Sequence, residues 1–184
     1  MNTINYQEEL QKLIDTKQLV EVVLQDLPSY LVAYILAANA KYLTLAIVSS
    51  SATLTGVSIV RTSDIDSISI ESIYLSELVK EIKDDSVYQR ALDDIKDISE
   101  FTFAGFSESL EKSKTIVEIT TNSEDSFAGR LVGHDDDIFV LDEYSTESDK
   151  RVKRTYFDQA TIARISLDVA WLNTIARSLA EKNI

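Results

Sequence analysis

Two mainly apolar runs of strand length stand on either side of a polar segment in the second half of the chain. In residues 127–133 (FAGRLVG), the positions 127, 129, 131 and 133 alternate with Ala128, Arg130 and Val132, and residues 138–141 form a β-branched and aromatic run. Residues 134–137 (HDDD) separate them, and aspartate favours turns because its side chain can bond its own backbone. The pattern predicts a β-hairpin. Gly129 and Gly133 indicate that its first strand is bent and strongly twisted.

A similar pattern occurs in the first half of the chain. A shift of 97 residues aligns 62 positions without a gap, and eight of these are identical. It places residues 19–22 (LVEV) on 116–119 (IVEI), and residues 68–71 (ISIE) on 165–168 (ISLD). Because apolar positions match apolar positions in one register, the shift indicates an internal duplication. The alternative is two unrelated strand-rich segments.

Periodicity predicts the other elements. In the first copy we expect a helix over residues 5–16 and strands over 19–24, 30–36, 42–47, 57–61 and 65–70. Residues 74–112 have helical spacing with a break at 84–86, and the second copy has strands over 115–121, 127–133, 138–144, 152–157 and 161–167 and a helix over 169–181. Tyr74 and Trp171, at equivalent positions, are expected to anchor the core.

These elements predict an α+β, mainly β fold with two tandem small five-stranded barrels. The predicted domains are residues 1–75, with the N-terminal helix and first barrel, and residues 114–184, with the second barrel and C-terminal helix. A helical linker over residues 76–113 joins them.

A helix followed by five short strands, with a central hairpin of the form Gly-x-Leu-x-x-x-Asp-x-x-apolar, resembles the Sm-like (LSm and Hfq-like) fold, an open SH3-like barrel. The residues that match this motif are Gly129, Leu131, Asp135 and Ile138. The resemblance implies barrels that pair through edge strands, and an RNA site containing an asparagine. That asparagine position falls on Phe139 and, in the first copy, on Tyr42, neither of which can bond a base.

The charge of the chain limits its possible partners. Eighteen basic residues against thirty-one acidic ones give a net charge of −13, so nucleic-acid binding needs a local basic site. The candidate is a basic strip, residues 150–154, whose cations could bind RNA or another anion beside a stacking tyrosine: Lys150, Arg151, Lys153, Arg154 and Tyr156. The alternatives are a solvated loop, charge protection of an edge strand, or pairing with the acidic turn at 135–137. No DNA partner is expected.

Catalytic chemistry has few candidate residues. The chain has no cysteine and one histidine, His134, which we interpret as a turn residue. The acidic residues at 135–137 and 142–143 lack the spacing of a calcium loop, and no phosphate-binding or nucleophile motif occurs. We therefore expect no catalytic residues, metal or cofactor. The absence of cysteine and of a signal-peptide pattern favours a cytoplasmic protein.

Residues 30–48 are apolar enough to resemble a membrane span. A lysine at position 41 and the lack of a basic flank argue against one. As a hairpin, this segment is apolar on both faces, so each face needs a cover: the linker helices, the other barrel or another chain. Ile35, Leu43 and Leu45 are the candidate interface residues.

The sequence therefore favours a non-enzymatic binding or adaptor protein that associates with a protein partner or with itself. One alternative is an Sm-like RNA-binding protein that uses residues 150–154. Another is a small metal-dependent hydrolase.

Overall fold

The computed structural model has an α+β, mainly β fold that divides into two units, Met1–Lys96 and Asp97–Ile184. It describes residues 5–25, 30–82, 86–98, 100–135, 137–144, 151–167 and 172, without the side chains of residues 151 and 152. The sequence predicted three segments, with a linker over 76–113, whereas the structure divides into these two units.

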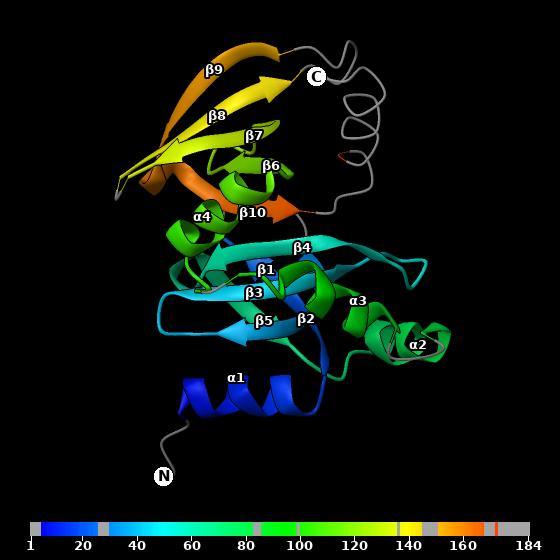
Figure 1. The fold of residues 1–184 in the computed structure, drawn as a ribbon. Helices are drawn as coiled ribbons and strands as arrows, with labels where there is room; N and C mark the ends of the chain where they lie inside the picture. Colours follow the sequence, from blue (N-terminus) through cyan, green and yellow to red (C-terminus); the bar gives the residue numbers. More distant parts are fainter. Residues whose placement is uncertain are drawn as a thin grey trace. The chain divides into compact units, whose positions relative to one another are not determined.

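Unit 1 contains an antiparallel sheet with the strand order β5-β1-β2-β3-β4 (Figure 1). Its elements are α1 (Tyr6–Asp15), β1 (Leu19–Leu24), β2 (Tyr30–Ala38), β3 (Tyr42–Val48), β4 (Leu54–Arg61), a 3-10 turn (Thr62–Asp64), β5 (Ile65–Ser69), α2 (Ile73–Glu81) and α3 (Ser86–Ile95). The predicted helix and five strands of the first copy are confirmed. Residues 30–48 form β2 and β3, and within the described residues no helix is long and apolar enough to span a membrane.

Unit 2 repeats this arrangement with the order β10-β6-β7-β8-β9. Its described elements are α4 (Phe103–Ser113), β6 (Ile116–Thr121), β7 (Ser126–His134), β8 (Ile138–Tyr144), β9 (Arg151–Asp158), a 3-10 turn (Gln159–Thr161) and β10 (Ile162–Leu167). The predicted C-terminal helix over 169–181, apart from Leu172, and two residues of the break at 84–86 lie outside the described residues.

Hydrogen-bond registers relate the two sheets strand by strand. Leu19 pairs with Tyr34 in unit 1, and Ile116 pairs with Arg130 in unit 2. Ile116 follows Leu19 by 97 residues, whereas Arg130 follows Tyr34 by 96. The shift is thus 97 residues for β1 but 96 for β2 and β3, and it returns to 97 for β4 and β5. The gap-free alignment was therefore wrong by one residue across the hairpin: Asn39 corresponds to Asp135 and not to Asp136.

The repeat also includes the helix before each sheet. Asn5 caps α1 and Thr102, 97 residues later, caps α4, each by accepting a backbone hydrogen bond with its side chain. α4 falls within the predicted linker, yet it stands where α1 stands. The repeated part of each unit is therefore a capped helix followed by five strands.

The core of unit 1 lies between α1 and one face of its sheet. Leu10 of α1 is buried there with eight strand residues: Val20, Val22, Leu24, Ala33, Ile35, Leu43, Leu45 and Val60. The three interface candidates, Ile35, Leu43 and Leu45, are at most 1% exposed and pack inside this cluster. They lie in the interior because they alternate with the residues of the opposite face.

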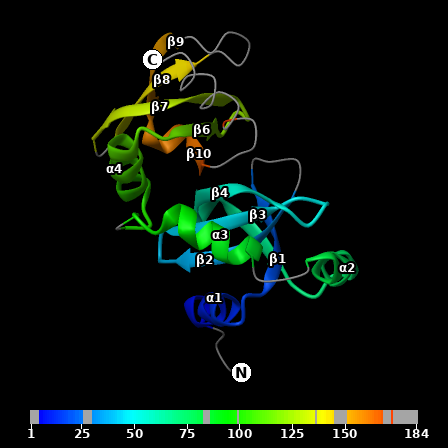
Figure 2. The ribbon, with the colours of Figure 1, turned by 45° about the vertical axis from the view of Figure 1, so that its right-hand side comes forward.

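The opposite face of β2 and β3 is buried as well. Tyr34 meets the ring of Tyr88 on α3 edge-on, with the ring centroids 5.5 Å apart, and Ala91 of α3 is fully buried. Figure 2 shows α3 lying across the strands of unit 1. Of the three expected covers, a helix of the predicted linker therefore covers part of this face.

Candidate binding sites

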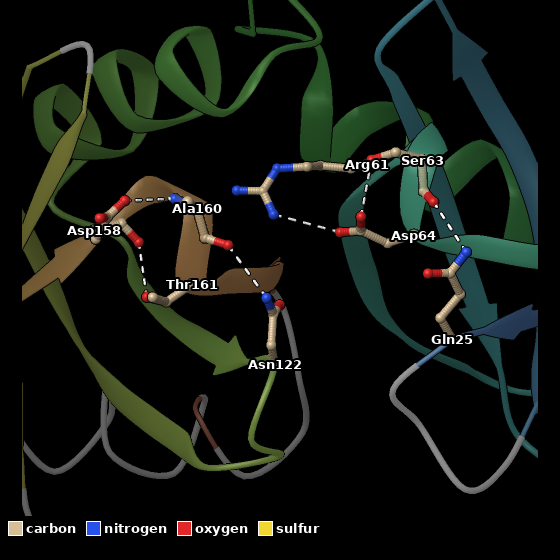
Figure 3. A network of polar contacts seen from close by, with 8 residues as sticks. All are labelled: Gln25, Arg61, Ser63, Asp64, Asn122, Asp158, Ala160 and Thr161. Carbon is tan, nitrogen blue, oxygen red and sulfur yellow. Dashed lines mark hydrogen bonds and ion pairs between the residues drawn. The ribbon is translucent and has the colours of Figure 1, made fainter.

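In each unit the hairpin tip, the 3-10 turn and the end of the first strand meet at one edge, which we call the loop edge. Figure 3 shows the side chain of the residue after the first strand donating to the 3-10 turn, Gln25 to Ser63 and Asn122 to Ala160. In unit 1 the Thr62 amide donates to the Lys41 carbonyl at 2.8 Å, and the Gln25 amide donates to the Asp64 carbonyl at 2.9 Å. In unit 2 the corresponding bonds run from Gln159 to Asp137 at 2.6 Å and from Asn122 to Thr161 at 2.9 Å.

The loop edge of unit 1 uses its polar groups internally. The Asn39 Oδ1 atom accepts hydrogen bonds from the amides of Lys41 and Tyr42, both at 2.9 Å. Arg61 reaches the Asp64 carboxylate at 3.4 Å, and the Tyr42 side chain is 8% exposed. The asparagine therefore forms the turn. The predicted base-binding position, placed on Tyr42 by the shift of 97 residues, falls on Leu43 with the shift of 96, and Leu43 is fully buried.

The loop edge of unit 2 is acidic. The Asp135 Oδ1 atom accepts from the amides of Asp137 at 3.0 Å and Ile138 at 2.8 Å, and these bonds hold the pKa of Asp135 below its usual range. Asp158 caps the following turn by accepting from the Ala160 amide at 2.8 Å. Such an edge repels phosphate, and Phe139 is fully buried behind it.

The basic strip carries cations that already have carboxylate partners. Arg154 on β9 binds both oxygens of Asp142 on β8, at 2.7 and 3.0 Å. Lys153 lies 3.4 Å from Glu143, the next residue of β8. The expected pairing with the turn at 135–137 is therefore replaced, for these two cations, by pairing with the neighbouring strand, because β8 and β9 place these residues directly opposite one another.

The other members of the strip are Lys150, Arg151 and Tyr156. Lys150 lies outside the described residues, and Arg151 begins β9 with its side chain undescribed. Tyr156 is 66% exposed and is available for a contact. Within the described part, the strip thus offers one exposed aromatic ring beside two cations already paired with carboxylates.

A second polar feature lies on the same face of β8. Arg130 on β7 is directly opposite Asp142, and its guanidinium lies 5.7 Å from the ring centroid of Tyr144. The Nε atom of Arg130 is buried without a hydrogen-bond partner. These residues line a cavity of about 390 Å³ together with Glu111 and Lys114. Its charged side chains are two cations and two carboxylates, so it has no clear preference for an anion.

His134 serves a structural contact. Its Nδ1 atom lies 2.7 Å from Glu111 on α4, and its ring stacks on Phe139 at 6.0 Å between centroids. Within the described residues, no three acidic or histidine side chains gather in a way that could hold a metal ion. The geometry around His134 joins α4 to β7.

Unit 1 exposes a compact group of large hydrophobic side chains, which we call the apolar patch. Its members are Tyr30, Ile70, Ile73 and Tyr74. Ile73 is 86% exposed, and the rings of Tyr30 and Tyr74 meet edge-on at 6.2 Å. Tyr74, expected to anchor the core, is 37% exposed. Trp171, its expected counterpart, lies outside the described residues.

The start of α2 holds this patch in place. Glu71 adopts a left-handed conformation with φ of 60°, which turns the chain between β5 and α2. Ser72 then caps α2 by accepting from the Leu75 amide at 3.1 Å, while its hydroxyl donates to Glu21 on β1 at 2.6 Å. Leu75 and Leu78 turn inward, so Ile73 and Tyr74 remain outside. The sequence signal was an apolar stretch on α2 wider than one buried helix face requires.

Comparison of the chain with protein-family models, with curated proteins and with solved structures finds no match.

Proposed function

We propose that this chain is a non-enzymatic binding protein that associates with another protein through the apolar patch of unit 1. The observation that carries the proposal is the grouping of exposed side chains. Of the eight large hydrophobic residues exposed in the described part of the chain, four belong to the patch. Scattered exposed hydrophobic residues are normal, but grouped ones are typical of an interaction surface.

We further propose that each unit is an Sm-like barrel. The support is the strand order, in which the fifth strand lies beside the first, and a β-bulge in the same pairing of both units, at Val23/Leu24 and at Ile162/Arg164. A bulge bends a strand and increases its twist, as curling a sheet into a barrel requires. The helix before each sheet agrees with the family pattern.

RNA binding is the weaker alternative. Arg154 and Lys153 would have to exchange their carboxylate partners for phosphate, and Asp142 and Glu143 would then lie beside that phosphate. The net charge of −13 opposes the approach of RNA as well. Titration of short single-stranded RNA at low salt tests this alternative by fluorescence anisotropy.

The experiment for protein association compares three forms of the full chain in affinity capture from the source cells: the wild type, Ile73→Glu and Tyr156→Glu. Ile73 is 86% exposed and is the first residue of α2, where a carboxylate suits the helix dipole, so Ile73→Glu preserves the fold. Tyr156→Glu adds the same charge at an exposed residue of unit 2.

We expect Ile73→Glu to lose a protein that the wild type and Tyr156→Glu both retain. If all three forms capture the same proteins, and sedimentation velocity shows the wild type to be monomeric, association through the patch is refuted. Circular dichroism of each form checks that the fold is kept.

A further inference from the structure

We infer that the partner segment is a basic amphipathic helix, whose apolar side covers the patch and whose lysines or arginines meet a rim of exposed carboxylates on the neighbouring residues of the same elements. This inference rests on the proposed function, because it assigns a chemistry to the occupant of the same surface. The rim consists of three exposed carboxylates: Asp66 on β5, Glu71 on the turn between β5 and α2, and Glu81 at the end of α2.

The described residues of unit 1 do not neutralise the carboxylates of the rim. Asp66, Glu71 and Glu81 make no hydrogen bond or ion pair with the described residues, whereas Glu77 is paired with Lys80 at 2.6 Å. A cationic side chain that reaches Glu71 therefore gains an interaction without breaking another. Unpaired charges beside an exposed apolar group are what an interface with a hydrophobic core and a polar rim requires.

The same charges argue against a second copy as the occupant. In a symmetric dimer through the patch, each chain would place its rim carboxylates against the identical carboxylates of the other. Both chains carry a net charge of −13, so association would begin against a long-range repulsion. An anionic lipid surface meets the same repulsion. A basic segment is attracted on both counts.

The compact shape of the patch favours a helix over an extended strand. Three of its members lie within residues 70–74, and the fourth, Tyr30, contacts Tyr74. A helix presents apolar side chains at i, i+3, i+4 and i+7 as one compact stripe, which can cover such a group. An added strand would instead spread its side chains along the edge of β5.

The test uses a synthetic peptide as its probe. A fluorescein-labelled amphipathic helical peptide of leucine and lysine, with blocked ends, is titrated with the full chain, and its matched control replaces every lysine by glutamate. Anisotropy is measured at about 50 and about 150 mM salt, since rim contacts weaken with screening. Four variants accompany the wild type: Ile73→Glu, Tyr156→Glu, the rim pair Asp66→Asn with Glu71→Gln, and the remote pair Asp97→Asn with Glu100→Gln.

We expect the basic peptide to bind the wild type, and Ile73→Glu to weaken it about tenfold or more, as loss of a central contact does. The rim pair should weaken binding several-fold and reduce its salt dependence, as expected when peripheral charges are removed. Tyr156→Glu and the remote pair should remain within about twofold of the wild type, because surface changes away from a site have small effects.

Three results would overturn the inference. The first is that the basic peptide binds no better than the acidic one. If Ile73→Glu nevertheless loses a partner in the affinity-capture experiment, association through the patch stands, and only the assignment of a basic helix fails. The second is that the remote pair weakens binding as much as the rim pair, which would show attraction to net charge alone. The third is a wild-type dimer that Ile73→Glu dissociates, which would make a second copy the occupant.

Discussion

Lys17 and Lys114, 97 residues apart, occupy the same position in the two units. Each follows the last turn of a helix in the left-handed conformation, with φ of 49° and 55°. The Lys17 amide donates to the Ile14 carbonyl at 3.0 Å, and the Lys114 amide donates to the Glu111 carbonyl at 3.3 Å, the same bond 97 residues later. Left-handed helix endings are common, so it is their spacing of 97 residues, the same as that of the caps Asn5 and Thr102, that supports duplication.

Lys114→Gly should stabilise unit 2. Glycine adopts the left-handed conformation without the cost that a Cβ atom brings, and the expected gain is about 0.5–1 kcal/mol. Lys17→Gly should gain less, because the Lys17 ammonium lies 5.1 Å from the ring centroid of Tyr88 and that contact would be lost. Urea denaturation of both variants measures the difference. Equal gains in the two variants would show that the Tyr88 contact contributes nothing.

The strands were predictable because their patterns are local. β1 was predicted at Leu19–Leu24 and is found there, and β8 at 138–144 has the expected bounds. The one-residue offset of the hairpin was not predictable, because it arises in the connections between strands. Five residues join β1 to β2 but four join β6 to β7, and five join β3 to β4 but six join β8 to β9. The two changes compensate each other, so a gap-free alignment fits both ends of the repeat. The bulges between Ile35 and Ala37 and between Leu131 and Gly133 lie at equivalent positions and do not cause the offset.

The candidate sites were harder to predict, because burial and pairing are tertiary properties. The sequence could not show that Leu45 faces the core, since both faces of its strand are apolar. Nor could it show that Arg154 lies opposite Asp142, which depends on the β8–β9 register. The patch was missed because a large aromatic residue such as Tyr74 is usually expected in the core. The exposure of Tyr74 follows from the turn at Glu71.

Gly129→Ala should destabilise unit 2 by about 2 kcal/mol or more, as overpacking does. A Cβ atom at Gly129 would lie 2.8 Å from Leu141 Cγ and 2.9 Å from the carbonyl carbon of Asp142, so the backbone of β8 would have to move. Gly133→Ala is the matched control in the same strand, since its nearest atom, Val140 Cγ2, would be 3.9 Å away. Thermal denaturation compares the two. Similar losses in both would contradict the close approach of β8 to Gly129.

Leu45→Ala should cost about 2–5 kcal/mol of unfolding free energy, the usual range for a fully buried leucine. The equivalent residue of unit 2, Leu141, is equally buried, and Leu141→Ala should show a loss in the same range. Val79→Ala, at a residue 48% exposed, is the control and should change stability by no more than about 0.5 kcal/mol. Urea denaturation measures all three. If Leu45→Ala left stability unchanged while reducing partner capture, Leu45 would be an interface residue after all.

Asp135→Asn should make the unfolding free energy of unit 2 less dependent on pH in the acidic range. The backbone amides of Asp137 and then of Ile138 hold the pKa of Asp135 below its usual value, so the ionised carboxylate stabilises the fold above the pKa of the unfolded state, about 3.9. That stabilisation is lost as the pH falls through the lower pKa of the folded state. An asparagine accepts the same two bonds at every pH, as Asn39 does in unit 1.

The stability gap is the unfolding free energy of the wild type minus that of Asp135→Asn. This gap should therefore be largest near neutral pH and should decrease below about pH 4. Urea denaturation across this range measures the gap. Asp66→Asn removes the same charge from a carboxylate without a hydrogen bond among the described residues, so it reports the general effect of net charge. If the two variants shifted in parallel with pH, the acid dependence would come from net charge, and the two amide bonds to Asp135 would not be its source.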